Sequence, residues 1–308
     1  MKILFTGSSS FTGYHFINDL ADNGHEIIVT FSQKKNFYLR QKNNRSIRVK
    51  KLIDRFDCHF NVNFSKNSSI KFVNNLLQVD IFCHHFADTK NYKLNTFDIF
   101  SALKNNTKNI SNCIGALKEK GLKYYIYTGS YFEPKEEFSK DYSSFSLYGV
   151  TKSLTGQLIR HHCYNYDVIY KKFIIPNPFG ELEDENRILS IVADHWIKKK
   201  VFLIKHPEYL RDNIPIRILS NCYCDFILKK NIKSYSPSFY RLSNINFISR
   251  FSNEVKKRSK LKCEFKYLDD SLYDEPKKKY NYHRIKLSQY SLSSKQIWDD
   301  LVKYYLKN

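Results

Sequence analysis

Short apolar runs alternate with amphipathic segments along the first half of the chain. Apolar runs of roughly four to eight residues predict buried strands, and apolar positions three and four apart predict helices packed on a sheet. The expected strands are Lys2–Phe5, Glu26–Phe31, Phe60–Phe64, Asp80–Phe86, Tyr124–Tyr127 and Val168–Ile175. The expected helices are Gly13–Asn23, part of 33–55, Ser69–Leu77, Phe97–Lys120 and Gly149–Tyr166.

Strands that alternate with helices predict a parallel sheet with right-handed crossovers and helices on both faces. We therefore expect an α/β fold, a Rossmann-type doubly wound sheet over residues 1–176, with a smaller substrate-binding region at 177–308 interleaved with it. The pattern is looser in that second part. It predicts helices at Ile188–Lys199, Asn221–Lys230 and Ser294–Leu306, a strand at Val201–Ile204, and irregular structure over 233–287.

The first strand runs directly into a turn of small residues, Gly7-Ser8-Ser9-Ser10-Phe11-Thr12-Gly13. Small residues let backbone N–H groups approach a pyrophosphate at the N-terminus of the following helix. Ser10 stands where a further glycine would be expected, and an ordinary strand–turn–helix connection is the alternative. The position after the first strand favours a dinucleotide cofactor, with Gly7, Ser10, Phe11, Thr12 and Gly13 lining it.

The end of the second strand has no acidic residue to bind the hydroxyls of the adenosine ribose, as an NAD site has. It reads Phe31-Ser32-Gln33-Lys34-Lys35. Ser32 and Lys34 are suited to a ribose 2′-phosphate, whereas a solvated basic loop is the alternative interpretation. The sequence therefore favours NADP over NAD, with contacts at Phe31, Ser32 and Lys34.

Tyr148 and Lys152 are one helical turn apart. The same spacing occurs five times in this chain of 23 tyrosines, but only this pair begins a long helix-like segment after a buried strand. A tyrosine titrates near pH ~10, and a lysine one turn away is expected to favour the phenolate, so that the tyrosine acts as acid or base. Packing of Tyr148 at a helix start is the structural alternative.

Composition gives little support to other functions. The formal net charge is +21 over 308 residues, but lysines are spread along the chain and no zinc finger, basic arm or RNA-binding motif is present. A nucleic-acid partner would rest on charge alone, and we expect none. No apolar stretch approaches membrane-spanning length, and the run Ile3–Phe5 is too short for a signal peptide. We expect a cytoplasmic protein that does not enter membranes.

Metal binding is not expected either. The seven cysteines form no disulfide framework, and Cys222 and Cys224 lack a second ligand pair at metal spacing. The doublet His84-His85 lies on a predicted strand, where neighbouring side chains point to opposite faces, and we expect structural roles for it and for His161-His162.

The order of the motifs resembles the extended short-chain dehydrogenase/reductase family, in its NAD-dependent epimerase/dehydratase branch that acts on nucleotide-sugars. The likeness covers nearly the whole chain. Thr6-Gly7 to Gly13 resembles TGxxGxxG, and Tyr148/Lys152 resembles the YxxxK pair. The remaining matches are His85-Phe86-Ala87, Asn106, Thr128-Gly129-Ser130-Tyr131-Phe132, Asn177-Pro178-Phe179-Gly180 and Arg211-Asp212.

The resemblance implies roles for these residues. Phe86, Ala87, Asn106 and Ile175 would join Tyr148 and Lys152 around the cofactor. Thr128 would bind the substrate oxygen, because it lies four residues before Phe132 as in the family's segment, with Ser130 in reserve. Asn177 and Arg211 would bind the substrate. A homodimer is implied, formed by helices of the Phe97–Lys120 and Gly149–Tyr166 type.

The departures from the family narrow the reaction. Sugar 4,6-dehydratases of this kind carry Thr-Asp-Glu, whereas this chain has Thr128-Gly129-Ser130, and Glu133 comes three residues too late. A dehydratase is therefore disfavoured. The resemblance implies 4-keto-sugar reduction or epimerisation on a nucleotide-sugar, in cell-surface polysaccharide synthesis. The alternative is a non-catalytic dinucleotide-binding regulatory protein of the same fold.

Overall fold

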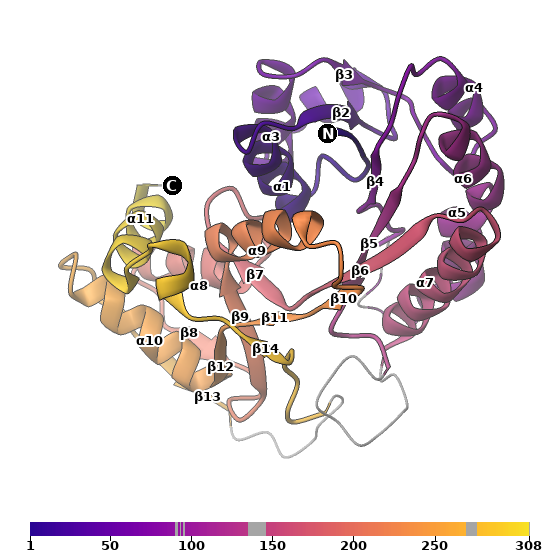
Figure 1. Cartoon of the computed structure of the whole chain (residues 1–308). Coiled ribbons are helices and arrows are strands. Elements are labelled where there is room, and N and C mark those ends of the chain that lie inside the picture. Colours follow the sequence, from indigo (N-terminus) through magenta and orange to yellow (C-terminus); the bar gives the residue numbers. More distant parts are fainter. Residues whose placement is uncertain (90–91, 93, 95, 135–145, 269–275, 308) are drawn as a thin grey trace.

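The fold is built on a central parallel sheet in the computed structural model (Figure 1), which describes residues 1–89, 92, 94, 96–134, 146–268 and 276–307. Seven strands of the described residues pair in the order β10-β6-β5-β4-β1-β2-β3, and every neighbouring pair is parallel. They are β1 Lys2–Phe5, β2 Glu26–Thr30, β3 Cys58–His59, β4 Ile81–His84, β5 Tyr124–Ser130, β6 Ile169–Ile175 and β10 Ser234–Tyr235.

Helices cover both faces of this sheet, as Figure 1 shows. On one face α1 packs against α3 and α9, and on the other α4, α6, α7 and α5 pack in succession. Their bounds are α1 Phe11–Asp22, α2 Lys35–Leu39, α3 Asn44–Ile53, α4 Ser68–Asn74, α5 Ile99–Thr107, α6 Ile110–Glu119, α7 Leu147–Asn165 and α9 Ile216–Leu228. The order reverses between β1 and β4, which is where ligands bind in doubly wound sheets. The predicted Rossmann-type fold is confirmed.

The rest of the chain forms a smaller α/β region. Its three-stranded sheet has the order β12-β9-β7, and two further strand pairs are β8 with β13 and β11 with β14. The bounds are β7 Asn177–Phe179, α8 Ile188–Ile197, β8 Phe202–Ile204, β9 Leu210–Pro215, β11 Pro237–Ser238, β12 Tyr240–Ser243, α10 Asn244–Lys256, β13 Phe265–Tyr267, β14 His283–Arg284, η1 Leu287–Tyr290 and α11 Ser294–Lys307. Because β10 and α9 join the first region, the two are interleaved; a boundary at residue 176 stays a prediction.

The aromatic residues fill the core where the two regions meet. The ring of Phe16 on α1 stacks on Tyr223 of α9 with centroids 4.0 Å apart, and Phe173 of β6 packs edge-on against Tyr223 at 5.0 Å. All three side chains are fully buried. The helix α9 comes from the second half of the chain. It is nevertheless part of the hydrophobic core that packs against the central sheet.

Four predicted elements were wrong in detail. The long helix over 97–120 is two helices, because the chain departs from helical geometry at Asn109 (φ −118°, ψ 17°). The strand predicted at 60–64 lies at Cys58–His59 instead, and the helix predicted from 221 already begins at Ile216, directly after Pro215. In its described residues, the region 233–287 is not irregular, since it contains α10 and five short strands.

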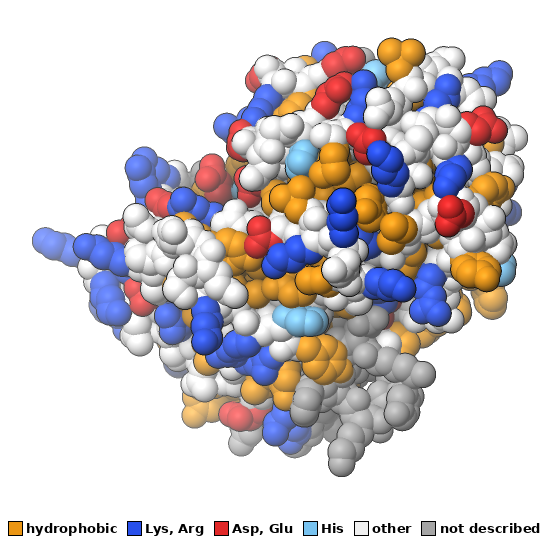
Figure 2. All heavy atoms as spheres, in the orientation of Figure 1, with side chains coloured by type: hydrophobic (Ala, Val, Ile, Leu, Met, Phe, Trp, Pro, Cys, Tyr) orange, Lys and Arg blue, Asp and Glu red, His pale blue; other side chains and the backbone are white. Residues whose placement is uncertain are grey.

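Charged side chains of both signs are mixed on one face of the molecule (Figure 2). On the face drawn in Figure 2, Lys and Arg side chains are interspersed with Asp, Glu and uncharged groups rather than gathered in one patch. All seven cysteines are free thiols. In the described part of the chain, no helix is long and apolar enough to cross a membrane, and no group of three His, Cys, Asp or Glu residues is placed to hold a metal ion.

Candidate active site

The turn between β1 and α1 has the shape that a dinucleotide pyrophosphate needs. Gly7 has φ +73°, and a Cβ there would lie 2.8 Å from the backbone carbon of His85. A Cβ on Gly13 would lie 2.6 Å from the carbonyl oxygen of Gly7. Only glycine fits at these two positions, so the turn can close tightly at the N-terminus of α1. The residues present therefore fit a dinucleotide.

Ser10 replaces a glycine without strain. Its φ of −71° is open to any residue, and its hydroxyl accepts a hydrogen bond from the Gly13 amide, which caps α1. The same hydroxyl donates to the carbonyl oxygen of Gly7 across 2.8 Å. The serine thus fixes the turn, and Phe11 and Thr12 follow it as buried residues of the first helical turn.

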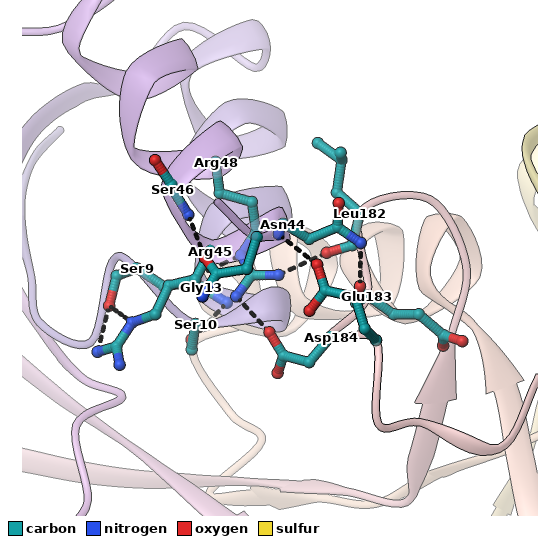
Figure 3. A network of polar contacts seen from close by, with 12 residues as sticks. Ser9, Ser10, Gly13, Asn44, Arg45, Ser46, Arg48, Leu182, Glu183 and Asp184 are labelled. Carbon is teal, nitrogen blue, oxygen red and sulfur yellow. Dashed lines mark hydrogen bonds and ion pairs between the residues drawn. The ribbon is translucent and has the colours of Figure 1, made fainter. Parts of the chain in front are cut away.

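Two arginines of α3 form hydrogen bonds with this turn at Ser9, as Figure 3 shows. Arg48 is 1% exposed and donates to the carbonyl oxygens of Ser9 and Leu182 and to the carboxylate of Asp184. Arg45 donates through Nε and Nη2 to the hydroxyl of Ser9, at 3.1 and 2.9 Å. Sequence reasoning missed both, because contacts between α3 and the turn leave no local pattern.

The predicted contacts at the end of β2 have different surroundings. Phe31 is buried and its ring stacks on Phe60 with centroids 4.7 Å apart, so its side chain belongs to the core. Ser32 is half-buried, with its hydroxyl 3.5 Å from that of Tyr38. Lys34 is exposed and precedes α2. Ser32 and Lys34 remain suited to a ribose phosphate, while Phe31 offers only its backbone.

The segment after β4 lines the same edge of the sheet. The amides of His85 and Phe86 both donate to the hydroxyl of Thr6, which fixes the strand end beside the glycine turn. Asn106 is buried and accepts a hydrogen bond from the Asp88 amide, so α5 supports this segment. Phe86 and Ala87 are half-buried. The cofactor contacts that the family resemblance implied for them stay a prediction.

Tyr148 and Lys152 lie one turn apart on α7, which begins where the Ser146 hydroxyl accepts a hydrogen bond from the Gly149 amide. Lys152 is 3% exposed; its Nζ donates to the carbonyl oxygen of Thr128 across 2.6 Å and lies 4.3 Å from the ring centroid of Tyr127. The structure therefore connects the predicted tyrosine–lysine pair to β5, the strand that carries the predicted hydroxyls.

The electrostatics of this pair differ from the sequence-based expectation. Burial raises the pKa of Tyr148, and Tyr92 and Glu133 add to the rise. Burial also lowers the pKa of Lys152 to about 8, although the Glu133 carboxylate opposes this. The expected lowering of the tyrosine pKa was wrong for these side chains, because desolvation, Tyr92 and Glu133 all act to raise it. The phenol keeps its proton at neutral pH.

Thr128 and Ser130 lie on the same face of β5, both buried. The Thr128 hydroxyl is 2.9 Å from Nδ1 of His85, whose Nε2 is 2.8 Å from the Thr12 hydroxyl. Burial lowers the pKa of His85 to about 3, so a neutral imidazole joins the two threonines. His85 was expected to have a structural role, and its side chain links the cofactor turn to β5.

The register of the sheet separates the two hydroxyls. His84, the last residue of β4, is paired with Tyr127 of β5. Thr128 and Ser130 therefore lie beyond the end of β4, and Ser130 is two residues closer to the carboxyl edge. Ligands of doubly wound sheets bind outside that edge. The register favours Ser130 for contact with a substrate, whereas the sequence spacing favours Thr128.

Glu133 forms a buried ion pair next to these residues. It is fully buried, 2.6 Å from Nζ of Lys172 on β6, and accepts a hydrogen bond from the Ser130 amide across 2.7 Å. A Cβ on Gly129 would lie 2.7 Å from Cε of Lys172 and 2.8 Å from Oε1 of Glu133. Gly129 therefore makes room for this pair.

Asn177 and Arg211 line one cavity of about 470 Å³ in the second region. The Arg211 guanidinium lies 4.3 Å from the ring centroid of Tyr209 and donates to the carbonyl oxygens of Leu210, Pro276 and Lys277. The structure thus brings the two predicted substrate residues together. The remaining lining includes Lys205, His206, Asn213, Asn244, Phe202, Ile204 and Phe247.

The predicted site residues therefore fall into two groups. One surrounds the carboxyl edge of the sheet, from the glycine turn to Ser130, Tyr148 and Lys152. The other, Asn177 and Arg211, lines the cavity; Ile175 ends β6 just before Asn177, and its carbonyl oxygen accepts a hydrogen bond from the Tyr131 amide. Asp212, next to Arg211, is fully buried and accepts from the amides of Phe239 and Asn281, so it has a structural role.

The sequence matches a family model described as NAD dependent epimerase/dehydratase family over residues 3–216. The chain belongs to this family. The matched range contains the glycine turn, the Tyr148/Lys152 pair and Arg211. A comparison with curated proteins finds no match for the sequence.

Solved structures share the fold of this family member over its whole length. UDP-glucuronic acid 4-epimerase from Bacillus cereus, in complex with UDP-glucuronic acid and NAD, has a TM-score of 0.74 at 18% identity and covers 100% of this chain and 99% of its own. UDP-glucose 4-epimerase from Thermotoga maritima, with UDP-glucose, has 0.73 at 16%, covering 100% and 99%. The dTDP-glucose 4,6-dehydratase DesIV from Streptomyces venezuelae has 0.74 at 12%, covering 100% and 98%.

Proposed function

We propose that the protein is an NADP(H)-dependent oxidoreductase that reduces a 4-keto sugar carried on a nucleotide, with epimerisation at the same carbon as the second candidate. The observation that carries this proposal is the bond from Lys152 to the backbone of Thr128. It holds the Tyr148/Lys152 pair against the strand that ends in Ser130, at the sheet edge that also holds the glycine turn.

The bound nicotinamide would supply or accept a hydride. Gly7 and Gly13 would let the backbone meet the pyrophosphate, and Phe86, Ala87 and Asn106 would flank the ring and its ribose. Lys152 would bind the ribose hydroxyls. Tyr148 would give its proton to the sugar oxygen as the carbonyl becomes a hydroxyl, while Ser130 or Thr128 donates a hydrogen bond to that oxygen.

The charge state of the site supports reduction. A phenol whose pKa is raised by burial is a proton donor at neutral pH, which is what reduction of a ketone requires. An epimerase also needs the phenolate to take a proton, at a greater cost. Dehydration needs an acid and a base beside the hydroxyl, but the residues at those positions are Gly129 and Ser130, and Glu133 is paired with Lys172.

The cavity beside Asn177 supports a nucleotide-sugar. Arg211 and Lys205 place positive charge at its wall, and a guanidinium is well suited to a diphosphate. The two epimerases with similar folds are described with UDP-glucuronic acid and UDP-glucose, so UDP-linked sugars are the first substrates to try.

The proposal also includes the cofactor, the oligomeric state and the cellular role of the enzyme. NADP is preferred over NAD because β2 ends without a carboxylate, before Ser32 and Lys34. We also propose a cytoplasmic homodimer that pairs through α5 and α7, as the family resemblance implied, and a place in cell-surface polysaccharide synthesis.

Turnover of a panel of UDP-, dTDP-, CDP- and GDP-linked 4-keto sugars tests the proposal, with NADPH oxidation and product mass as readouts. Tyr148→Phe should lower kcat by about 10²–10⁴-fold and leave NADPH binding within twofold to threefold. If wild-type protein binds NADPH but turns over no sugar in the panel, and Tyr148→Phe changes no ligand affinity, the non-catalytic regulatory protein becomes the better description.

A further inference from the structure

Arg45 occupies a special place beside the glycine turn. Its guanidinium donates two hydrogen bonds to the Ser9 hydroxyl, and its carbon Cζ lies 5.2 Å from the ring centroid of Tyr38. The hydroxyl of Tyr38 in turn lies 3.5 Å from that of Ser32, the residue after Phe31. Arg45 therefore lies between the glycine turn and the end of β2.

This is where a dinucleotide places the ribose of its adenosine half. In a Rossmann-type fold the pyrophosphate lies on the first turn, and the ribose 2′ position reaches the end of the second strand. A carboxylate at that strand end would repel a 2′-phosphate, but Phe31 stands there. A nearby arginine accommodates the 2′-phosphate in NADP enzymes.

The two arginines of α3 differ in burial and in hydrogen-bond partners, and Figure 3 shows the network they form. Arg48 is fully buried and its guanidinium is committed to Ser9, Leu182 and Asp184. Arg45 is only half-buried, and among the described residues no ion pair involves it. A guanidinium has five N–H donors, so donors remain for an anion after two have bonded Ser9.

We propose that Arg45, together with Ser9 and Ser32, binds the 2′-phosphate of NADP(H) and thereby sets the cofactor preference. This inference rests on the proposed function and names a residue for it that the end of β2 did not reveal. The guanidinium would bind the phosphate oxygens with charge-assisted hydrogen bonds, the Tyr38 ring would support its plane, and the hydroxyls would bind the remaining oxygens.

Binding of nucleotide fragments tests the proposal without any turnover. Isothermal titration calorimetry should show that the wild-type protein binds 2′,5′-ADP at least about tenfold more tightly than 5′-AMP or 3′,5′-ADP. Arg45→Gln should weaken 2′,5′-ADP and NADPH by roughly 10- to 100-fold and change 5′-AMP and NADH by less than about threefold. Arg45→Lys should restore part of the loss, because the charge returns without the planar fork.

A matched control comes from the same helix. Lys50→Gln removes a charge from an exposed position of α3 and should leave all five affinities unchanged. Unchanged 5′-AMP binding by Arg45→Gln also shows that the variant is folded and its glycine turn intact.

The outcomes separate this inference from the proposed function. It is overturned if the wild-type protein prefers NADH, if Arg45→Gln binds NADPH as tightly as wild type, or if the variant loses 5′-AMP and 2′,5′-ADP equally. None of these outcomes contradicts a dinucleotide-dependent oxidoreductase, and a preference for NADH overturns only the choice of NADP. If wild-type protein binds neither NADPH nor NADH, the proposed function fails and the inference fails with it.

Discussion

Glu133 and Lys172 form an ion pair of 2.6 Å in which the glutamate side chain is fully buried and the lysine side chain is 15% exposed. Removing one partner of such a pair leaves a desolvated charge behind and is far more costly than removing a surface pair. Glu133→Gln should therefore lower the free energy of unfolding by about 3 kcal/mol. Urea unfolding at pH 7 measures it.

A second substitution and a surface control make this test specific. Lys172→Met added to Glu133→Gln should recover much of the loss, because no unpaired charge is left. Asp194→Asn breaks the exposed pair of Asp194 on α8 with Lys198, which follows that helix, and should cost at most about 0.5 kcal/mol. Equal costs for the buried and the exposed pair would contradict our account of Glu133.

The two hydroxyls of β5 should contribute unequally to catalysis. Ser130 lies two residues nearer to the carboxyl edge than Thr128, whose hydroxyl already contacts His85. We predict that Ser130→Ala lowers kcat by about 10²-fold or more, the usual cost of losing a hydrogen-bond donor to a reacting oxygen. Thr128→Val should cost less. Steady-state kinetics of both variants, with NADPH affinity as control, decide this, and the reverse ranking would return the role to Thr128.

The sequence predicted the fold well because the alternation of strand and helix is a local signal. The glycine turn and the Tyr148/Lys152 spacing are also local, so both were found before the structure. The break at Asn109 was missed, since the apolar positions of α5 and α6 continue one helical pattern across it. The helix α10 was missed for another reason: residues 233–287 were interpreted from their basic composition, although Phe247, Phe251 and Val255 form a buried stripe at helical spacing.

Contacts between distant segments explain what else the sequence left out. The bond of His85 to Thr128, the pair of Glu133 with Lys172 and the bonds of Arg45 to Ser9 each depend on which strands and helices become neighbours. No residue spacing or motif in the sequence predicts these contacts. The pKa of Tyr148 depends on burial in the same way, so its direction could not be derived from a lysine four residues away.

Apolar residues on α5 and α7 make a dimer interface testable. These helices pack side by side at one edge of the molecule in Figure 1. Leu154 and Leu158, one turn apart on α7, are 41% and 40% exposed, and Phe100 on α5 is 83% exposed. We predict a dimer in light scattering after gel filtration, which Leu158→Glu should convert to monomer.

The control for this prediction is Ile197→Glu on α8. Ile197 is 40% exposed, as Leu158 is, but lies outside α5 and α7. It should leave the dimer intact. A monomeric wild-type protein, or a dimer that survives Leu158→Glu and Leu154→Glu together, would refute pairing through these helices.

Lys152 should make the stability of the protein depend on pH in the alkaline range. Its pKa is lowered by burial to about 8, whereas in the unfolded chain a lysine titrates near ~10.4. Below pH 8 both states hold the proton, and the native state carries the full cost of burying the charge. Between these pKa values the unfolded state binds more protons, so the free energy of unfolding rises with pH.

Replacing the lysine removes this dependence. We compare the free energy of unfolding of Lys152→Met with that of the wild type at each pH. The variant's advantage should be largest near pH 7 and shrink by roughly 2 kcal/mol towards pH 10. Lys171 has a pKa lowered to about 8 by burial as well, but it is present in both proteins and cancels. Urea unfolding at several pH values measures the difference, and Lys50→Met, at an exposed site, is the control. If the free energies of unfolding of wild type and Lys152→Met vary with pH in parallel, Lys152 is not held as a desolvated cation. That result would contradict the charge state that we assign to the active site.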